Sequence, residues 1–220
     1  MILSDPTPIS VVGPAAQRRA RFLLDVAERA LVVVLYGALL YRVVMAYVAN
    51  GGAANLIVLV SEGLVVFFIL IRRPASDVSL QPADWLFALL ATTTPLLVQP
   101  AAQHTLLLPS LGAGMMLVGL VVQLTAKLTL GRSFGWAPAH RGLKLWGPYR
   151  VVRHPMYTGY LFCHLAFLLM NWTTWNAIAY AACYAAQIPR LLAEERLLRR
   201  DERYEKYMAA VRFRLLPGLF

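Results

Sequence analysis

The chain has 220 residues, of which 59% are hydrophobic and only 15% are charged, and its mean hydropathy is +0.59. These values lie outside the range of soluble domains and indicate a membrane protein. The net charge is +10, but no basic-aromatic module or helix-turn-helix pattern accompanies it, so nucleic-acid binding explains it poorly. Cys163 and Cys183 both lie in apolar stretches, which excludes a disulfide-stapled secreted domain.

The apolar runs predict six helical segments. The runs from Trp85 to Ala126 and from Pro155 to Pro189 contain no Asp, Glu, Lys or Arg. Each is long enough for two crossings, because one crossing needs about 20 residues. No cleavable signal is expected, because the first basic cluster leads into a full-length apolar segment. We therefore expect an all-α integral membrane protein with segments near residues 29–48, 54–71, 84–99, 105–126, 156–170 and 173–190.

The last two segments are short and are joined only by residues 171–173. This short link predicts a tight helical hairpin. Its second arm is expected to continue past Pro189 into a charged, amphipathic cytoplasmic helix, with the proline tilting or kinking it at the membrane surface.

The basic residues are distributed asymmetrically between the two ends of the predicted segments. Three connections carry no charge: the one at Gly51 and Gly52, the one from Pro100 to Gln103 and the one at 171–174. The connections and termini on the opposite side of the membrane, with the adjoining helix ends, contain 20 of the 21 Lys and Arg residues. The positive-inside rule then places both termini and the loop 127–153 in the cytoplasm, in the inner or plasma membrane if the source is bacterial. The basic side faces anionic membrane lipids.

Arg42 and Glu62 are the ionisable residues expected deepest in the first two segments. Charges inside a bilayer are costly unless they are paired, so we expect an ion pair between them, with a proton- or substrate-handling role as the alternative. Residues 1–126 are interpreted as a scaffold of four helices and residues 127–220 as the cofactor-binding region. No inverted repeat is visible, which favours an enzyme over a carrier.

The loop before the fifth segment has the composition of an ordered structure: it reads GRSFGWAPAHRGLKLWGPYRVVRHPMYTGYL. His154 followed by Pro155 is a helix-start signature, and it aims His154 and the nearby amides at the membrane surface. Tyr157 and Gly159 place an aromatic ring and a gap in the first turns, where a planar ligand could approach. The alternative is an interfacial helix anchor.

A pair of glutamates, Glu194 and Glu195, follows the sixth segment. Successive helical residues diverge by about 100°, so one carboxylate can point inward while the other stays in water. The alternative is two helical salt bridges, from Glu194 to Arg190 and from Glu195 to Arg199.

These elements, together with the ending YEKYMAAVRFRLLPGLF, resemble the isoprenylcysteine carboxyl methyltransferase family, which shares the RHPxYxG and EE motifs. The similarity covers roughly residues 130–220. It implies an integral membrane enzyme that uses S-adenosylmethionine, held on the cytoplasmic side. The resemblance implies site residues in three places. The RHPxYxG motif supplies His154, Pro155, Tyr157 and Gly159, and the EE motif supplies Glu194 and Glu195. The loop that leads to the first motif, called the approach loop, supplies Tyr149 and Arg153.

The chemistry of S-adenosylmethionine fits these residues. Helix amides with His154 or Arg153 suit its carboxylate, a glutamate suits its ammonium or ribose, and Tyr157 suits its adenine. Glu195, Glu194 and Arg190 are the candidate catalytic residues, with a glutamate as base if the acceptor is an amine or thiol. Glu195 is expected to be the glutamate that faces the cofactor.

Two other functions stay open. Membrane sterol-type reductases use NADPH and share an HPxY-like element, although their motif favours Asn at the position of Met156. A non-catalytic scaffold or small transporter is the second alternative. No metal is expected, because the four histidines lack ligand spacing. The acceptor is expected to be lipid-like or lipidated and dissolved in the membrane, with a carboxylate favoured and an amine or thiol possible.

Overall fold

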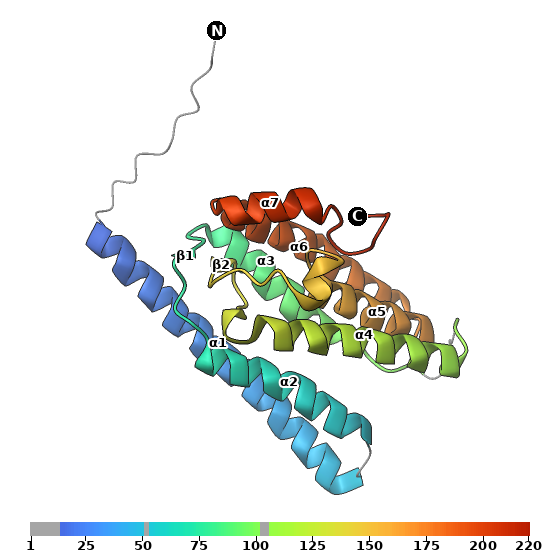
Figure 1. Cartoon of the computed structure of the whole chain (residues 1–220). Helices are drawn as coiled ribbons and strands as arrows, with labels where there is room; N and C mark the ends of the chain where they lie inside the picture. The colour runs from blue at the N-terminus through green and yellow to red at the C-terminus, as the bar shows by residue number, and fades with distance from the viewer. Residues whose placement is uncertain (1–13, 51–52, 102–105) are drawn as a thin grey trace.

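The computed structural model describes residues 14–50, 53–101 and 106–220, and these are almost wholly helical (Figure 1). A two-residue antiparallel strand pair, β1 with β2, and short 3-10 turns connect the helices. The elements in chain order are α1 (Pro14–Asn50), α2 (Ala53–Ile71), β1 (Asp77–Val78), α3 (Pro82–Thr93), α4 (Pro109–Leu130), β2 (Ala139–His140), α5 (Pro155–Met170), α6 (Thr174–Leu198) and α7 (Glu202–Ala210).

Helices occupy the places of all six predicted segments, except that a 3-10 turn at 94–97 replaces the end of the third. Gly51, Gly52, Gln103 and the expected start at 105 lie outside the described residues. Within the described residues, two helical stretches are long and apolar enough to cross a bilayer, Arg19–Ala49 and Pro109–Ser133. Shorter apolar helices cover Leu59–Ile71 and Pro155–Met170.

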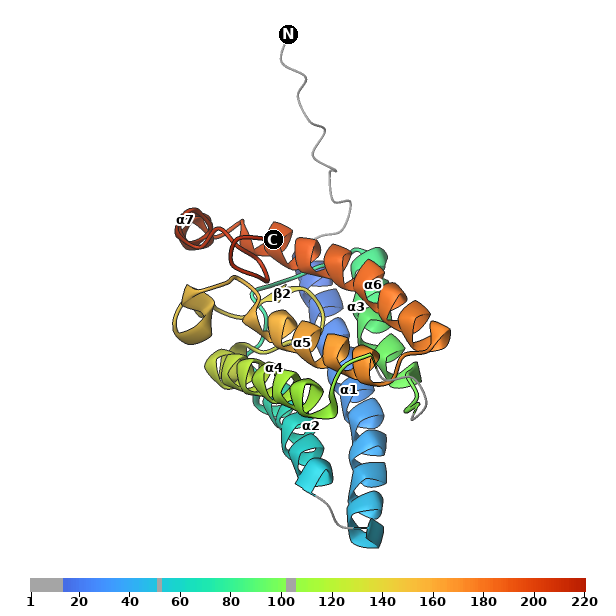
Figure 2. The same ribbon diagram turned by 90° about the vertical axis from the view of Figure 1, so that its right-hand side faces the viewer.

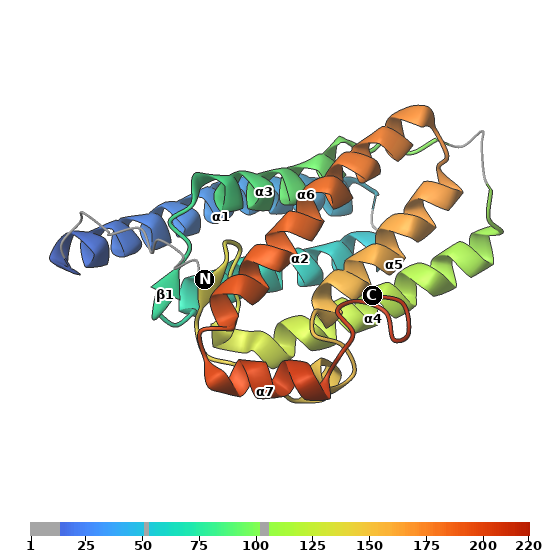
Figure 3. The same ribbon diagram turned by 90° about the horizontal axis from the view of Figure 1, so that it is seen from above.

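The six long helices form three antiparallel pairs, α1 with α2, α3 with α6, and α4 with α5. Figures 1 and 3 show α4 and α5 side by side along their length. Consecutive in sequence, α5 and α6 each pack mainly against a different helix. The expected tight hairpin is therefore not confirmed.

Two glycines allow the close approach of α4 and α5. A Cβ atom on Gly159 would lie 2.6 Å from both the carbonyl oxygen of Gly119 and the amide nitrogen of Gln123. A Cβ on Gly119 would lie 2.7 Å from the carbonyl oxygen of Gly159. Small residues at such a crossing let helix backbones touch, which is how helices commonly pack in membranes.

A buried carboxylate joins α1 to distant parts of the chain. Glu28 is only 1% exposed and lies 2.6 Å from Arg72 and 3.1 Å from Arg141. Its Oε1 atom also accepts hydrogen bonds from the backbone amides of Trp136, at 2.7 Å, and Ala137, at 3.1 Å. One side chain therefore fixes the end of α2 and the loop between α4 and α5.

The predicted ion pair between Arg42 and Glu62 is wrong. Arg42 is exposed on α1, and the Glu62 carboxylate lies 3.7 Å from the Nζ atom of Lys127 on α4. Lys127 is fully buried and also donates to the Ser61 hydroxyl at 3.1 Å. The sequence could not distinguish these partners, because Lys127 was assigned to the cytoplasmic side by its position in the chain.

The C-terminal region covers one face of the helical pairs, where Figure 2 shows α7 and the chain end beside α6 and the start of α5. As predicted, α6 continues past Pro189, to Leu198. Asp201 then caps α7 by accepting a hydrogen bond from the amide of Arg203. We call residues 211–220, which follow α7, the C-terminal strap.

Replacement of Gly159 by Ala tests the packing of α4 on α5. The added methyl group would overlap backbone atoms that cannot rotate away, so we expect a loss of about 1 to 3 kcal/mol in unfolding free energy. Thermal unfolding of the detergent-solubilised protein measures this. Gly114→Ala on α4 is the matched control, since nothing lies within 4 Å of its added Cβ. Equal stability of both variants would contradict the close packing.

Candidate functional site

The start of α5 is fixed by the C-terminal strap. Pro155 occupies the first position of α5 and His154 precedes it in a non-helical conformation, which confirms the predicted helix start. The amides of Arg153 and His154 donate to the carbonyl oxygens of Phe213, at 3.0 Å, and Arg214, at 2.9 Å. These two amides are therefore occupied by the strap and cannot bind a ligand.

Glu195 is the inward-facing member of the glutamate pair and is only 1% exposed. Its carboxylate lies 3.3 Å from Nε of Arg153, 3.3 Å from Nε2 of His154 and 3.1 Å from Nε of Arg214. Burial alone would raise the pKa of Glu195, but the hydrogen bond with His154 and the charges of His154, Arg153 and Arg214 together lower it. Glu195 thus joins α6, α5 and the strap.

Glu194 is partly exposed and faces a different environment. The Tyr157 hydroxyl donates to its Oε2 atom at 3.0 Å, and Nδ1 of His154 lies 4.0 Å from the same oxygen. The rings of His154 and Tyr157 are stacked, with centroids 5.5 Å apart. His154 therefore lies between the two carboxylates.

The alternative of two helical salt bridges holds for only one glutamate. Glu195 lies 3.6 Å from Arg199. Glu194 does not pair with Arg190 in the described structure; the guanidinium of Arg190 instead donates to the carbonyl oxygen of Trp136 at 2.8 Å. The predicted pair between Glu194 and Arg190 is therefore wrong. Glu195 was expected to face the cofactor only because Glu194 would be occupied by Arg190, so that expectation loses its reason.

Two small clefts of about 40 and 60 Å³ open beside Glu194, which lines both. Tyr149, Arg153 and His154 line the larger one. Burial, reinforced by the charge of Glu194, raises the pKa of Tyr149 well above its usual value, so this phenol stays neutral. The Tyr204 hydroxyl, also in the larger cleft, is buried without a hydrogen-bond partner among the described residues.

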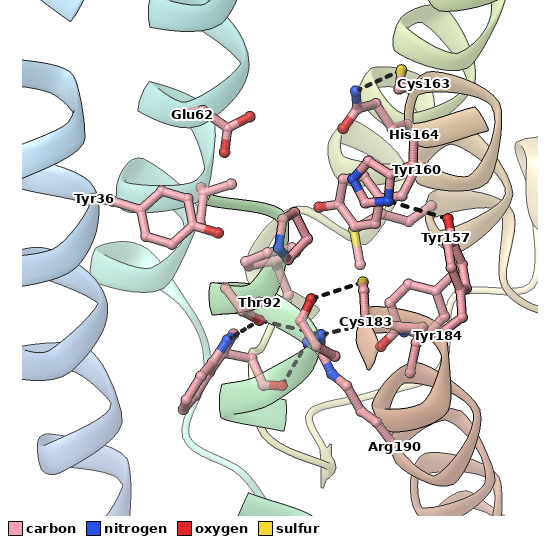
Figure 4. Close-up of a pocket in the computed structure, with 18 residues that line it drawn as sticks. Tyr36, Glu62, Thr92, Tyr157, Tyr160, Cys163, His164, Cys183, Tyr184 and Arg190 are labelled. Atoms are coloured by element: carbon pink, nitrogen blue, oxygen red, sulfur yellow. Dashed lines mark hydrogen bonds between the residues drawn. The ribbon is translucent and has the colours of Figure 1, made fainter. Parts of the chain in front are cut away.

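A larger cavity of about 210 Å³ lies deeper between the helices (Figure 4). All six long helices contribute to it, and Tyr36, Glu62 and Arg190 point toward its interior in Figure 4. Gln123 and Gln187 also line it. The cavity wall is thus polar at several points although the surrounding helices are apolar.

The cavity and the smaller cleft share a wall, made of Trp136, Met156, Tyr157 and Arg190. The Arg190 guanidinium lies over the Tyr157 ring, 5.4 Å from its centroid. Two ligands bound on the two sides of this wall would meet at these side chains.

Three of the expected site residues, Gly159, Pro155 and Glu195, lie in helix packing or ion pairs and not in the walls of the cavity or the clefts. Gly159 faces the backbone of α4, and Pro155 starts α5; neither lines the cavity or the two clefts. Glu195 lines none of these three spaces either. No cluster of three or more His, Cys, Asp or Glu residues that could hold a metal occurs in the described part of the chain.

Sequence reasoning missed several residues of the site. Tyr36 and Gln123 carried no signal, because single polar residues in apolar segments are also common in structural roles. Trp136 and Tyr204 lay in stretches read as approach loop and chain ending. Of the cavity residues in the first four segments, the sequence singled out only Glu62, because a carboxylate in an apolar segment requires an explanation.

The C-terminal half of the chain is similar to known methyltransferases. Residues 108–206 match the family model of phospholipid methyltransferases. Protein-S-isoprenylcysteine O-methyltransferase A of Arabidopsis thaliana is 30% identical over 113 residues, which cover 47% of this chain and 57% of that relative. The methyltransferase resemblance is confirmed. It covers α4 to α6 and the first half of α7, and so includes the wall that the smaller cleft shares with the cavity.

Glu195→Gln is expected to alter the acid stability of the protein. Because the folded-state pKa of Glu195 is lowered, its charge stabilises the fold above the ordinary carboxyl pKa of about 4.3, and this stabilisation is lost as pH falls through the lowered value. The variant should melt lower than the wild type at pH 7, with the difference narrowing below about pH 4. Melting temperatures measured across this range would contradict the role of Glu195 if the two curves ran parallel.

Proposed function

We propose that this chain is an integral membrane enzyme that transfers a methyl group from S-adenosylmethionine to the carboxylate of a lipid-like acceptor at the cytoplasmic membrane surface. The similarity to methyltransferases supports the reaction class. The geometry around Arg190 carries the choice of acceptor. The NADPH-dependent reductase and the non-catalytic scaffold are less consistent with the family match.

The cofactor is proposed to bind at the two clefts around Glu194. A carboxylate, the unpaired hydroxyl of Tyr204 and the basic side chains of Arg153 and Arg141 line these clefts. They complement the ammonium, hydroxyl and carboxylate groups of S-adenosylmethionine. Ligand pockets occupy about 300 to 1,000 Å³, so the clefts would have to widen and join when the cofactor binds.

The acceptor is proposed to bind in the larger cavity, with its carboxylate at Arg190. Arg190 is only 6% exposed, and its hydrogen-bond acceptors are neutral groups of Trp136, Thr92 and Gln187. No carboxylate pairs with Arg190 among the described residues. A buried cation without a counter-ion is costly, so this position favours an anionic ligand and disfavours an ammonium.

The mechanism follows from the shared wall. S-adenosylmethionine, when bound, supplies an electrophilic methyl group for in-line displacement. A carboxylate is already nucleophilic at neutral pH, so no residue has to remove a proton. Arg190 would orient the acceptor oxygen, while Met156 and Tyr157, on the same wall, would exclude water from the path between cleft and cavity. Glu194 is then a cofactor-binding residue and not a base.

The membrane arrangement is part of the proposal. We propose six crossings, both termini in the cytoplasm, a scaffold in residues 1–126 and cofactor binding in residues 127–220. The one-sided distribution of Lys and Arg supports the orientation. The cavity draws Tyr36, Glu62 and Gln123 from the scaffold, which would make that part the acceptor side of the enzyme.

Glu194→Gln should weaken cofactor binding, because it removes the charge that would hold the ammonium or ribose. We expect a loss of about 1.5 to 3 kcal/mol, or roughly 10- to 150-fold in Kd for S-adenosylhomocysteine. Calorimetric titration of the solubilised protein measures this, with NADPH titrated in parallel. Glu205→Gln, exposed on α7, is the control. Binding of NADPH in place of S-adenosylhomocysteine would refute the proposed use of S-adenosylmethionine as the cofactor.

Arg190→Met tests the acceptor. With octadecanoic acid as probe, we expect KM to rise about 10- to 100-fold, because a charge-assisted contact to the carboxylate is lost. The Kd for S-adenosylhomocysteine should change less than about twofold, and Arg190→Lys should recover part of the lost affinity. Mass spectrometry of the methyl ester provides the rates. Methylation of a long-chain amine in place of the acid would overturn the carboxylate assignment.

A further inference from the structure

The end of the cavity away from Arg190 contains hydrogen-bonding groups that the proposed reaction does not use. Figure 4 shows Glu62 and Cys163 at this end and Arg190 at the other. Gln123, which also lines the cavity, lies here because its Nε2 atom is 3.7 Å from the Cys163 sulfur. Methyl transfer at Arg190 leaves this end without a role.

Gln123 has an unsatisfied acceptor. The residue is 6% exposed, and its Oε1 atom is buried without a hydrogen-bond partner in the described chain. An unpaired buried carbonyl destabilises the protein, so such a group in a cavity wall indicates that a ligand supplies the donor. At the other end, Gln187 beside Arg190 has the opposite deficiency, an unpaired Nε2 donor. The two ends therefore require complementary groups from a ligand.

The donor required at the Gln123 end is uncharged. Glu62 also lines the cavity there, but its carboxylate is already balanced by Lys127 at 3.7 Å and accepts from Ser61 at 2.8 Å. An ammonium ion would add an unbalanced positive charge beside Lys127. A hydroxyl or amide N–H satisfies Gln123 without that cost.

The spacing of the two ends follows from α5. Tyr157 lies under Arg190, and Cys163, six residues further along the helix, lies at the Gln123 end. At 1.5 Å per residue, Tyr157 and Cys163 are about 9 Å apart along the helix axis, which sets the scale of the separation between the ends. An extended chain advances about 1.2 Å per bond, so this distance corresponds to seven or eight bonds from the carboxylate.

We propose that the cavity selects acceptors that carry an uncharged hydrogen-bond donor, a hydroxyl or an amide, about eight bonds from the methylated carboxylate, and that Gln123 recognises this donor. The inference rests on the proposed function for the position of the carboxylate. A mid-chain hydroxy acid is the simplest acceptor of this kind. Its carboxylate meets Arg190 and Gln187, and its hydroxyl meets the unpaired oxygen of Gln123.

The test compares octadecanoic acid with its 8-hydroxy and 2-hydroxy derivatives, using the full chain in lipid nanodiscs. We expect kcat/KM for the 8-hydroxy acid to exceed that for the other two by about tenfold, because a site built to bind a hydroxyl disfavours analogues that lack it. Equal values for the three acids would overturn the proposal and would mean that water satisfies Gln123.

Variants test which residue recognises the hydroxyl. Gln123→Met keeps the length of the side chain but removes the acceptor, so the ratio of 8-hydroxy to unsubstituted acid should fall to about 2. Thr125→Val, exposed on the same helix, should keep the wild-type ratio. An unchanged ratio in Gln123→Met would overturn the assignment. If that variant fails to fold, the wild-type acid series still decides whether the cavity prefers the hydroxyl.

A binding measurement separates this inference from the proposed reaction. The change in tryptophan fluorescence on binding, to which Trp136 in the cavity wall contributes, provides a Kd for each acid without turnover. Tighter binding of the 8-hydroxy acid without ester formation would refute carboxylate methylation but support the selectivity of the cavity. Ester formation without preference among the acids would support the reaction and refute the selectivity.

Discussion

The architecture depends on the burial of one carboxylate, that of Glu28. It balances Arg72 and Arg141 and also holds the amide of Trp136, whose carbonyl oxygen accepts from Arg190. The first helix is thereby connected, through two hydrogen bonds, to the cation that lines the cavity. Removal of one partner from such a buried pair costs about 3 to 5 kcal/mol, because it leaves uncompensated charge. The first helix therefore also determines where the wall between the smaller cleft and the cavity lies.

Much of the fold could be predicted, because apolar length, proline and charge act locally. Pro155 marked a helix start, and the helix through Pro189 continues as expected. The pairing of helices could not be predicted from chain order. Pairing depends on the shape of the helix surfaces. The pairing of α4 with α5 depends on a close contact between Gly119 and Gly159, which are 40 positions apart in the chain. The wrong ion pair of Arg42 has the same origin, since helix rotation determines which charges meet.

The candidate site was predictable in its motifs but not in its internal roles. The sequence indicated that Glu194 and Glu195 diverge, and they do. It favoured the inward one for the ligand, whereas the inward Glu195 is held by Arg153 and Arg214. A deeply buried carboxylate needs ion-pair and hydrogen-bond partners from the protein itself, so it is less available to bind a ligand. Arg214 lies in the C-terminal strap, and no local sequence pattern predicts its contact with Glu195.

The strap has a consequence for biosynthesis. A chain is made from its N-terminus, and the strap bonds to the start of α5, 60 residues earlier. All six long helices are synthesised before Phe213 and Arg214, so the region around His154 is still incomplete when the first segments reach the bilayer. Insertion and maturation are therefore separate events in time. A protein halted between them would sit in the membrane, held by its helices, without the means to order the start of α5.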